Sequence, residues 1–418
     1  MHLTIFDAAA ILIVLTALFA YLNLRFVKLP RSVGLTIMGA LGAFAVIGLD
    51  RLLPESRLGE EVIGFIAGID FHRTLMEGML SFLLFAGGLH VSWSDLRRAR
   101  WPVLGLSTIG VLLSTGIVGG GFYALAQLVG IPISLIWCLV FGALISPTDP
   151  IAVMDVLKRA EVGDTLKATV AGESLFNDGV GVVVFGILLA AAVSGETLSL
   201  ASAGGYFMRE AVGGLVLGLL TGWIAFRAMR SIDDYQTEVL ISLALVMGGY
   251  ALSHWIGVSG PVAMATAGLV IGNAGVAHAM SDTTRDYLLK FWSLIDDILN
   301  AILFLLIGLE VVTIDLESGS LLLGLLVIPL LLAARTLSVL GPLTAMRPLL
   351  DLGRLAPPIL IWGGLRGGIS VALALSLPFT EQRSPLLAAT YFVVLFAVIV
   401  QGGTIAWLIE WQKRKAAG

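Results

Sequence analysis

The segment 172–179, Gly-Glu-Ser-Leu-Phe-Asn-Asp-Gly, places two carboxylates inside an otherwise apolar run that extends from 168 to 193. Every peptide group at membrane depth must be hydrogen bonded within the protein, so an apolar run of this length predicts a transmembrane helix. An ionised carboxylate near the bilayer centre costs roughly 2.5–3.5 kcal/mol on insertion scales. Glu173 and Asp178 therefore each require a partner or a function.

The composition of the whole chain indicates the same class. Of the 418 residues, 58% are hydrophobic and only 13% are charged, and the mean hydropathy is +0.97. A soluble domain has a charged fraction of about 25%. We therefore predict an all-α polytopic membrane protein whose surroundings are the lipid bilayer. Nothing in the sequence predicts a cofactor, a catalytic centre or a nucleic-acid partner.

Apolar runs of about 18–25 residues, separated by charged or Gly/Pro-rich turns, predict about thirteen transmembrane helices. The predicted spans, numbered one to thirteen, are 5–25, 32–50, 74–93, 101–128, 133–156, 166–193, 206–229, 235–255, 258–277, 291–313, 319–345, 356–378 and 385–410.

The lysines and arginines alternate between the two sides of this predicted topology. Of the 25, 18 lie in the odd-numbered loops and the C-terminal tail, five lie on the opposite side, and Arg335 and Arg366 lie inside spans. Cytoplasmic loops of membrane proteins carry the excess of Lys and Arg. We therefore expect a multi-pass protein of the cell (inner) membrane, with its C-terminus in the cytoplasm and its N-terminus outside.

Two spans contain residues that interrupt a helix. Span five carries Ser-Pro-Thr-Asp-Pro at 146–150, and span twelve carries Trp-Gly-Gly-Leu-Arg-Gly-Gly at 362–368. If spans one to six and eight to thirteen are two halves, these are the fifth helices of each. Matching spans are then seven apart. Because seven is an odd number, matching spans cross the membrane in opposite directions, and the six-helix halves are inverted repeats. Crossed, interrupted helices at matching positions point to a transporter binding site, although simple kinks without a ligand are the alternative.

The polar residues of span six share helix faces. Ser174 and Asp178 are four residues apart, as are Glu173 and Asn177, so each pair occupies one face of a helix. The interrupted backbone at 148–149 frees carbonyl oxygens nearby. A hydroxyl, a carboxylate and carbonyls suit a hard cation such as Na⁺.

Asp178 could bind either a proton or a cation, but not both at once. That competition alone would couple the movement of one ion to the movement of the other. The alternative is that Asp178 only caps a half-helix or pairs with an arginine. Asp149 could equally lie at a half-helix N-terminus, where the helix dipole favours an anion.

Arg335 lies deep in span eleven and cannot readily lose its proton, so it requires a carboxylate. Glu173 is the leading candidate, with a structural role. Arg366 in span twelve is expected either to neutralise the C-terminal ends of broken helices or to pair with a carboxylate.

Further polar residues lie near predicted span ends. Glu77 in span three could line a cation entrance or could extend toward the membrane surface. Asp296, Asp297 and Asn300 open span ten, where they could attract cations to a cytoplasmic funnel or only cap the helix.

Four of these segments together resemble a known family. Thr-Asp-Pro at 148–150, the segment 172–178, the segment from Asn300 to Glu310, and Gly-Gly-Leu-Arg-Gly at 363–367 are similar to monovalent cation–proton antiporters. The resemblance is to the electroneutral sodium/proton exchanger (NhaP-type) branch and covers nearly the whole chain.

The resemblance implies an ion-binding core, a dimerisation domain and an elevator-like movement of the core. The core comprises 101–193 and 319–410, the dimerisation domain comprises 1–93 and 206–313, and 411–418 form a short cytoplasmic tail.

The resemblance also implies roles for site residues. Asp178 would be the ion and proton carboxylate. Ser174, Thr148 and the main chain of Asp149 would complete the cation site, and Asn177 would hold Asp178. Asparagine at 177, in place of a second aspartate, is the family's mark of electroneutral exchange.

The leading hypothesis is therefore a transporter, not an enzyme, that exchanges Na⁺ for H⁺ as a homodimer, with Li⁺ and K⁺ as alternative cations. A rival from another class is an intramembrane aspartyl protease in which Asp149 and Asp178 share a proton and activate water. A passive channel is a further rival. Ion preference, working pH and the physiological direction of exchange do not follow from the sequence.

Overall fold

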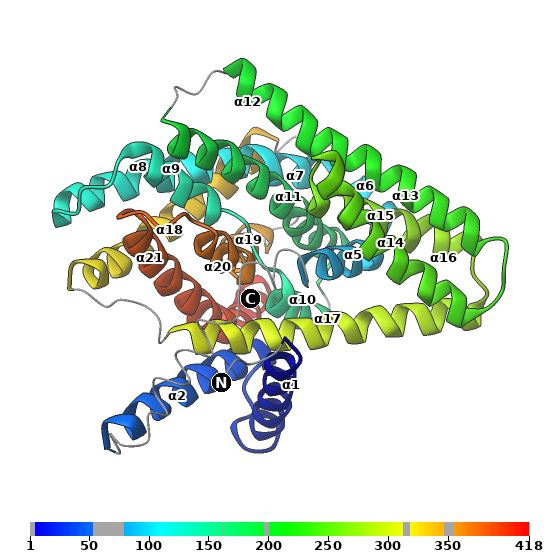
Figure 1. Ribbon diagram of the computed structural model, residues 1–418, viewed down its shortest axis with the longest axis horizontal. Coiled ribbons are helices and arrows are strands. Elements are labelled where there is room, and N and C mark those ends of the chain that lie inside the picture. The colour runs from blue at the N-terminus through cyan, green and yellow to red at the C-terminus, as the bar shows by residue number, and fades with distance from the viewer. Residues whose placement is uncertain are drawn as a thin grey trace.

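The computed structural model describes residues 5–52, 79–160, 162–195, 200–311, 318–346 and 355–417. Within these ranges the secondary structure is helical apart from one isolated antiparallel bridge, between Asp149 and Leu365. The helices pack side by side, and α1 and α2 project from one side of the molecule (Figure 1).

The α-helices have the following bounds in chain order: α1 Ile5–Leu22, α2 Arg31–Leu52, α5 Leu80–His90, α6 Trp93–Arg98, α7 Arg100–Leu104, α8 Val111–Val129, α9 Leu135–Leu144, α10 Ile151–Arg159, α11 Asp164–Ser194, α12 Leu200–Phe207, α13 Gly213–Met229, α14 Tyr235–Ile256, α15 Gly260–Val270, α16 Val276–His278, α17 Asp282–Glu310, α18 Ser318–Ala345, α19 Ala356–Trp362, α20 Gly368–Leu375, α21 Arg383–Phe396 and α22 Gly402–Ala417. Short π-helical segments join several of them, such as 105–110 between α7 and α8.

Within the described ranges, nine helical segments are long and apolar enough to cross a membrane, and three shorter apolar helices accompany them. This confirms the all-α membrane class. Every predicted span contains described helix, and α11 (Asp164–Ser194) reproduces span six almost residue for residue.

The prediction for the start of span ten was wrong. Helix α17 begins at Asp282 rather than at 291, because Ser281 caps it by accepting a hydrogen bond from the Thr284 amide at 3.4 Å. Asp296 and Asp297 therefore lie in the middle of a 29-residue helix and cannot cap its N-terminus.

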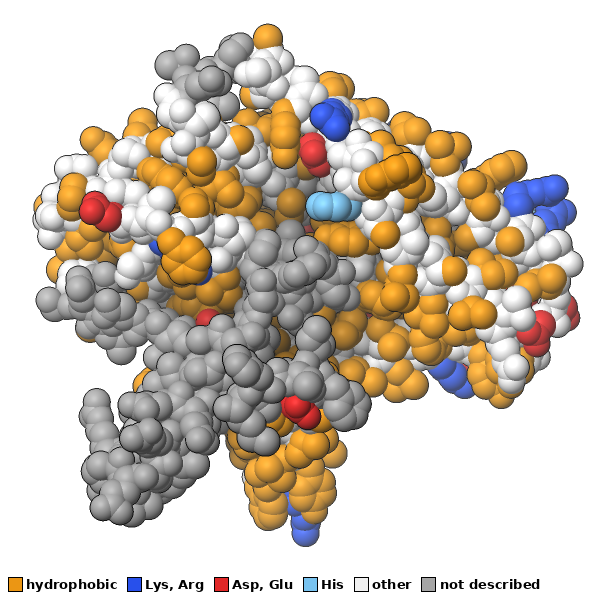
Figure 2. All heavy atoms as spheres, in the orientation of Figure 1, with side chains coloured by type: hydrophobic (Ala, Val, Ile, Leu, Met, Phe, Trp, Pro, Cys, Tyr) orange, Lys and Arg blue, Asp and Glu red, His pale blue; other side chains and the backbone are white. Residues whose placement is uncertain are grey.

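The outer surface has the character of a lipid-facing one. Large apolar side chains are exposed on several helices, including Leu24 at 80%, Leu128 at 78% and Trp255 at 87%. Hydrophobic side chains are spread over the described face shown in Figure 2, and charged side chains are few and scattered. Such a surface is stable only in an apolar solvent.

Two helices are broken at the predicted places. Helix α9 ends at Leu144 and α10 begins at Ile151, because Pro147 and Pro150 lack the amide hydrogens that a continuous helix requires. The second break separates α19 from α20 at the glycine-rich segment 363–367.

The two breaks contact each other through their backbones. The Asp149 amide donates a hydrogen bond to the Leu365 carbonyl at 2.9 Å. Peptide groups that lose their helical partners at membrane depth must be satisfied elsewhere. The two extended segments satisfy this requirement in part by bonding to one another.

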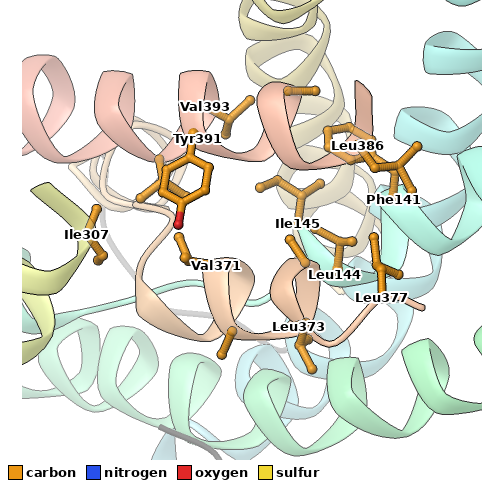
Figure 3. Packing of buried hydrophobic residues seen from close by; sticks show 14 of the residues in the cluster. Phe141, Leu144, Ile145, Ile307, Val371, Leu373, Leu377, Leu386, Tyr391 and Val393 are labelled. Carbon is orange, nitrogen blue, oxygen red and sulfur yellow. The ribbon is translucent and has the colours of Figure 1, made fainter. Parts of the chain in front are cut away.

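A continuous apolar core surrounds the breaks. Figure 3 shows side chains of α9, α20 and α21 meeting there, with Tyr391 extending from α21 toward α20. Phe141, Leu144 and Val371 are fully buried in this cluster. Close packing on several sides holds the short half-helices in place.

Glycines allow helices α5 and α15 to approach each other closely. A side chain at Gly88 of α5 would collide with the Ala265 carbonyl of α15, and one at Gly268 would collide with the Phe85 carbonyl of α5. Glycines at both contact points let the backbones approach closely, as is common in membrane helix pairs.

Candidate ion-binding site

Helix α11 (Asp164–Ser194) carries four polar residues in its buried part. Glu173, Ser174, Asn177 and Asp178 are between 1% and 7% exposed. Because they occupy two adjacent faces of one helix, all four can point toward the same neighbouring elements. The α9–α10 break lies against these faces.

Thr148, in the α9–α10 break, contacts two of these side chains. The Ser174 hydroxyl donates to the Thr148 carbonyl oxygen at 2.5 Å. The Asn177 amide nitrogen donates to the Thr148 hydroxyl at 2.7 Å, and the Thr148 backbone amide donates to the Asn177 amide oxygen at 3.3 Å. The three bonds position the unwound segment against α11.

Asp178 differs from its neighbours in having a free oxygen. It is 7% exposed, and its Oδ1 atom is buried without a hydrogen-bond partner. Among the described residues it forms no ion pair. A carboxyl group in such a place is stable when it is neutralised, either by a bound proton or, in its ionised form, by a bound cation.

Asp149 lies in the same break, with a different environment. Its Oδ1 atom accepts a hydrogen bond from the Ile151 amide at 2.9 Å, at the first residue of α10. The carboxylate thus lies at the N-terminus of a half-helix. Gly367 lies against it, since a side chain at that glycine would come within 2.5 Å of Asp149 Oδ2.

Glu173 and Arg335 form a buried, two-pronged ion pair. Arg335 Nη1 lies 2.5 Å from Glu173 Oε1, and Nη2 lies 3.2 Å from Oε2. The Arg335 side chain is 9% exposed and the Glu173 side chain is 3% exposed. Arg335 also donates to the Leu360 carbonyl from Nε at 3.1 Å and from Nη2 at 2.8 Å. The guanidinium therefore connects α18, α11 and α19.

Arg366, in the second break, contacts the first break. Its Nη1 atom donates to the carbonyls of Ser146 at 2.9 Å and Pro147 at 3.2 Å, directly after the end of α9. The residue is 1% exposed. Of the two placements anticipated for it, the structure shows the one beside a helix C-terminus, where the dipole favours a cation.

A small cavity lies between Thr148 and the Glu173–Arg335 pair. Its volume is about 10 Å³, and it is lined by Thr148, Pro150, Val170, Glu173, Arg335, Ile359, Leu360 and Gly363. A space of this size holds about one water molecule, and its walls include several polar groups.

The remaining predicted residues lie on α17 or outside the described ranges. Asp296 lies within electrostatic range of Asp149 and accepts a hydrogen bond from Asn300 Nδ2 at 3.0 Å. Asp297 forms an exposed ion pair with Arg31 at 3.7 Å. Glu77 lies outside the described residues.

Sequence reasoning missed several backbone contributors to this site. The Leu360 and Leu365 carbonyls accept hydrogen bonds from Arg335 and from the Asp149 amide. Sequence reasoning assigned Gly364 no contact with Arg335, yet a side chain there would collide with the Arg335 guanidinium. The paired glycines at 363–364 and 367–368 were the available signal for such close approach.

Chemically, the arrangement brings oxygen atoms to one buried place and adds the Asp178 carboxylate, which forms no ion pair within the part of the chain that the structure describes. Hydroxyl, carbonyl and carboxylate oxygens favour hard cations such as the alkali metals over soft ones. The same carboxylate can bind a proton instead.

Known proteins resemble this chain along nearly its full length. The family model described as "Sodium/hydrogen exchanger, transmembrane" matches residues 13–411. The Na(+)/H(+) antiporter NhaP of Pseudomonas aeruginosa is 45% identical over 408 residues, which cover 97% of this chain and 96% of that protein. The Na(+)/H(+) antiporter NhaH of Halobacillus aidingensis is 33% identical, with 92% and 93% covered.

A solved structure shows the same fold. The sodium proton antiporter MjNhaP1 from Methanocaldococcus jannaschii superimposes with a TM-score of 0.72 over 97% of this chain and 98% of its own, at 21% identity. The relatives are antiporters rather than enzymes, so the protease alternative built on Asp149 and Asp178 is set aside. On these grounds, the chain belongs to the sodium/hydrogen exchanger family of membrane transporters.

Proposed function

We propose that this protein exchanges Na⁺ for H⁺, one for one, by alternate binding of the two ions to Asp178. One observation carries the proposal. The buried arginines bind other groups, Arg335 the Glu173 carboxylate and Arg366 two backbone carbonyls, while the Asp178 carboxylate has an unpartnered buried oxygen. A carboxylate in that position must take its counter-charge from a mobile ion.

Exclusive binding couples the two fluxes. One carboxylate neutralised by one proton or by one monovalent cation has the same net charge in both loaded states. The loaded site can then cross between the two sides, whereas the empty charged site cannot do so at comparable cost. The exchange is therefore electroneutral, and membrane voltage does not drive it.

In this proposal the neighbouring residues divide the work. Ser174, Thr148 and the main-chain oxygen of Asp149 supply further oxygens for the cation. Asn177 holds the Thr148 segment beside Asp178 through its two hydrogen bonds. The Glu173–Arg335 pair and the hydrogen bonds from Arg366 to the carbonyls of residues 146 and 147 hold the broken helices in place.

We further propose thirteen membrane spans arranged as two inverted six-helix repeats, with the interrupted helices of spans five and twelve crossing at the site. Residues 101–193 and 319–410 would form a core that moves like an elevator against 1–93 and 206–313. The packing is consistent with this division. Helices α8, α9 and α11 pack together with α18, whereas α2 packs on α17 and α5 on α15.

The remaining features follow the sequence argument. The scaffold would form a homodimer in the cell (inner) membrane, with the C-terminus in the cytoplasm. Asp296, Asp297 and Asn300 would draw cations toward the site from the side where α17 is acidic, and Glu77 would act similarly from span three. Li⁺ and K⁺ are alternative cations for the same oxygens.

The proposal can be tested with the full-length protein in proteoliposomes. An inward Na⁺ gradient is imposed while an internal dye reports pH, with the membrane voltage clamped by K⁺ and valinomycin. We expect Na⁺-dependent alkalinisation inside that does not change with the clamped voltage. Asp178→Asn should abolish it, because the amide can exchange neither a proton nor a cation.

A matched substitution separates this role from general charge effects. Asp164→Asn removes a carboxylate at the start of the same helix whose side chain is 79% exposed, and it should retain most of the exchange. Exchange that persists in Asp178→Asn would exclude Asp178 as the carrier. Exchange whose rate follows the clamped voltage would exclude the one-for-one stoichiometry.

A further inference from the structure

A cluster of arginines lies outside the ion-binding site, at the junction of α5, α6 and α7. An open recess of about 540 Å³ there is lined by Trp93, Ser94, Arg97, Arg98 and Arg100. Three of its five lining side chains are cationic at neutral pH. The recess therefore has the composition of an anion site.

The arginines of this recess have no acidic partners among the described residues. Other surface basic residues do have them, for example Lys290 with Asp286 at 2.7 Å and Lys167 with Asp164 at 3.3 Å. Arg100 lies over the Trp101 ring at 5.4 Å, a contact that leaves its charge unneutralised. Their field is thus available to an external anion.

The position of the recess identifies which anion can reach it. It lies between the end of the apolar helix α5 at His90 and the start of the membrane-spanning segment at Arg100. Trp93 and Trp101 flank it and are 60% and 46% exposed. Tryptophan and arginine at helix ends occupy the level of the lipid headgroups.

The geometry points to a binding site for the phosphate of an anionic phospholipid in the recess formed by Trp93, Ser94, Arg97, Arg98 and Arg100. Guanidinium groups bind phosphate oxygens through two parallel hydrogen bonds. Clusters of basic residues beside a membrane helix attract anionic lipids. The Trp93 indole would lie beside the headgroup at this level.

The local structure holds this recess in place. The Trp93 amide donates to Asn273 Oδ1 at 2.6 Å, and Asn273 Nδ2 donates to the Val91 carbonyl at 3.0 Å. On the inner face of α6, buried Leu96 packs against Gly172 of α11, where a side chain would come within 3.0 Å of Leu96. Helix α6 therefore separates a bound headgroup from Gly172, the residue that precedes Glu173.

The test measures lipid binding to the detergent-purified full-length protein by native mass spectrometry. Short-chain phosphatidylglycerol, phosphatidylcholine and soluble glycerol phosphate are titrated separately. We expect the wild-type protein to bind phosphatidylglycerol at least about tenfold more tightly than phosphatidylcholine. We expect glycerol phosphate to bind more weakly than both lipids, too weakly for its complex to be retained in the mass spectrum. This comparison requires no substitution, so it does not depend on the folding of a variant.

Paired variants locate the site. Replacing Arg97 and Arg98 by glutamine should weaken phosphatidylglycerol binding about fivefold for each arginine, or on the order of 25-fold together. The matched control replaces Arg227 and Arg230, exposed arginines at the end of α13 that do not line the recess. It should retain the wild-type affinity.

Three results would overturn the inference. The first is equal wild-type affinity for the two lipids. The second is an equal loss in the Arg227/Arg230 control, which would indicate general surface charge. The third is glycerol phosphate binding as tightly as the lipid, which would assign the recess to a soluble phosphate. None of these results bears on Asp178 or on exchange.

Discussion

Replacing Glu173 by alanine is expected to destabilise the protein far more than it changes Na⁺ affinity. Among the described residues, the substitution leaves the buried Arg335 guanidinium with the Leu360 carbonyl as its one remaining hydrogen-bond acceptor. Both side chains are nearly inaccessible, at 9% for Arg335 and 3% for Glu173, so bulk water cannot solvate the guanidinium as it would at the surface.

The structure allows an estimate of the magnitude. Removing one partner of a buried ion pair costs about 3–5 kcal/mol, because the remaining charge is left uncompensated. For a chain of this size, such a loss corresponds to a decrease of roughly 5–10 °C in the unfolding midpoint. Replacing both partners by apolar residues of similar volume, Glu173→Leu with Arg335→Met, should recover most of the loss.

The assay is thermal unfolding of the purified protein in detergent, combined with the Na⁺ dependence of exchange in proteoliposomes. We expect Glu173→Ala to lower Tm and the number of active molecules, with little change in the KM for Na⁺. An unchanged Tm together with a tenfold or larger increase in KM would refute this reasoning. It would place Glu173 among the cation ligands instead of in the structural pair.

Three further predictions concern the ion site itself. Ser174→Ala removes the hydroxyl that contacts the Thr148 carbonyl at 2.5 Å, and the KM for Na⁺ should rise about tenfold, as one lost cation ligand implies, with Tm lowered by only a few degrees. Gly367→Ala places a methyl group against Asp149 and should lower both Tm and the exchange rate, whereas an alanine at the exposed Gly403, with open space around it, should lower neither. Lowering the pH should raise the KM for Na⁺ up to tenfold per pH unit, since protonation of Asp178 removes the site for Na⁺; a KM independent of pH in Na⁺-dependent uptake would contradict competition.

The sequence by itself determined the membrane class and the approximate positions of the apolar helices that the structure describes. Long apolar runs must satisfy their peptide groups internally, so they form helices regardless of their neighbours. Closely spaced prolines at 147 and 150 and paired glycines at 363–368 predicted the two breaks, which lie where expected, whereas the single prolines Pro329 and Pro342 lie inside the continuous helix α18. The burial argument also selected the Glu173–Arg335 pair, because few buried carboxylates were available to a buried guanidinium.

Only the tertiary structure decided which groups meet at the breaks. The partners of Arg366 are 219 and 220 residues away, and the Asp149–Leu365 bridge joins the two halves of the chain. A carbonyl oxygen carries no residue-specific signal, so no sequence pattern could identify Leu360 or Leu365 as acceptors. The boundary of α17 was also mistaken, because its first two turns are polar and hydropathy alone does not detect a helix that extends beyond the membrane.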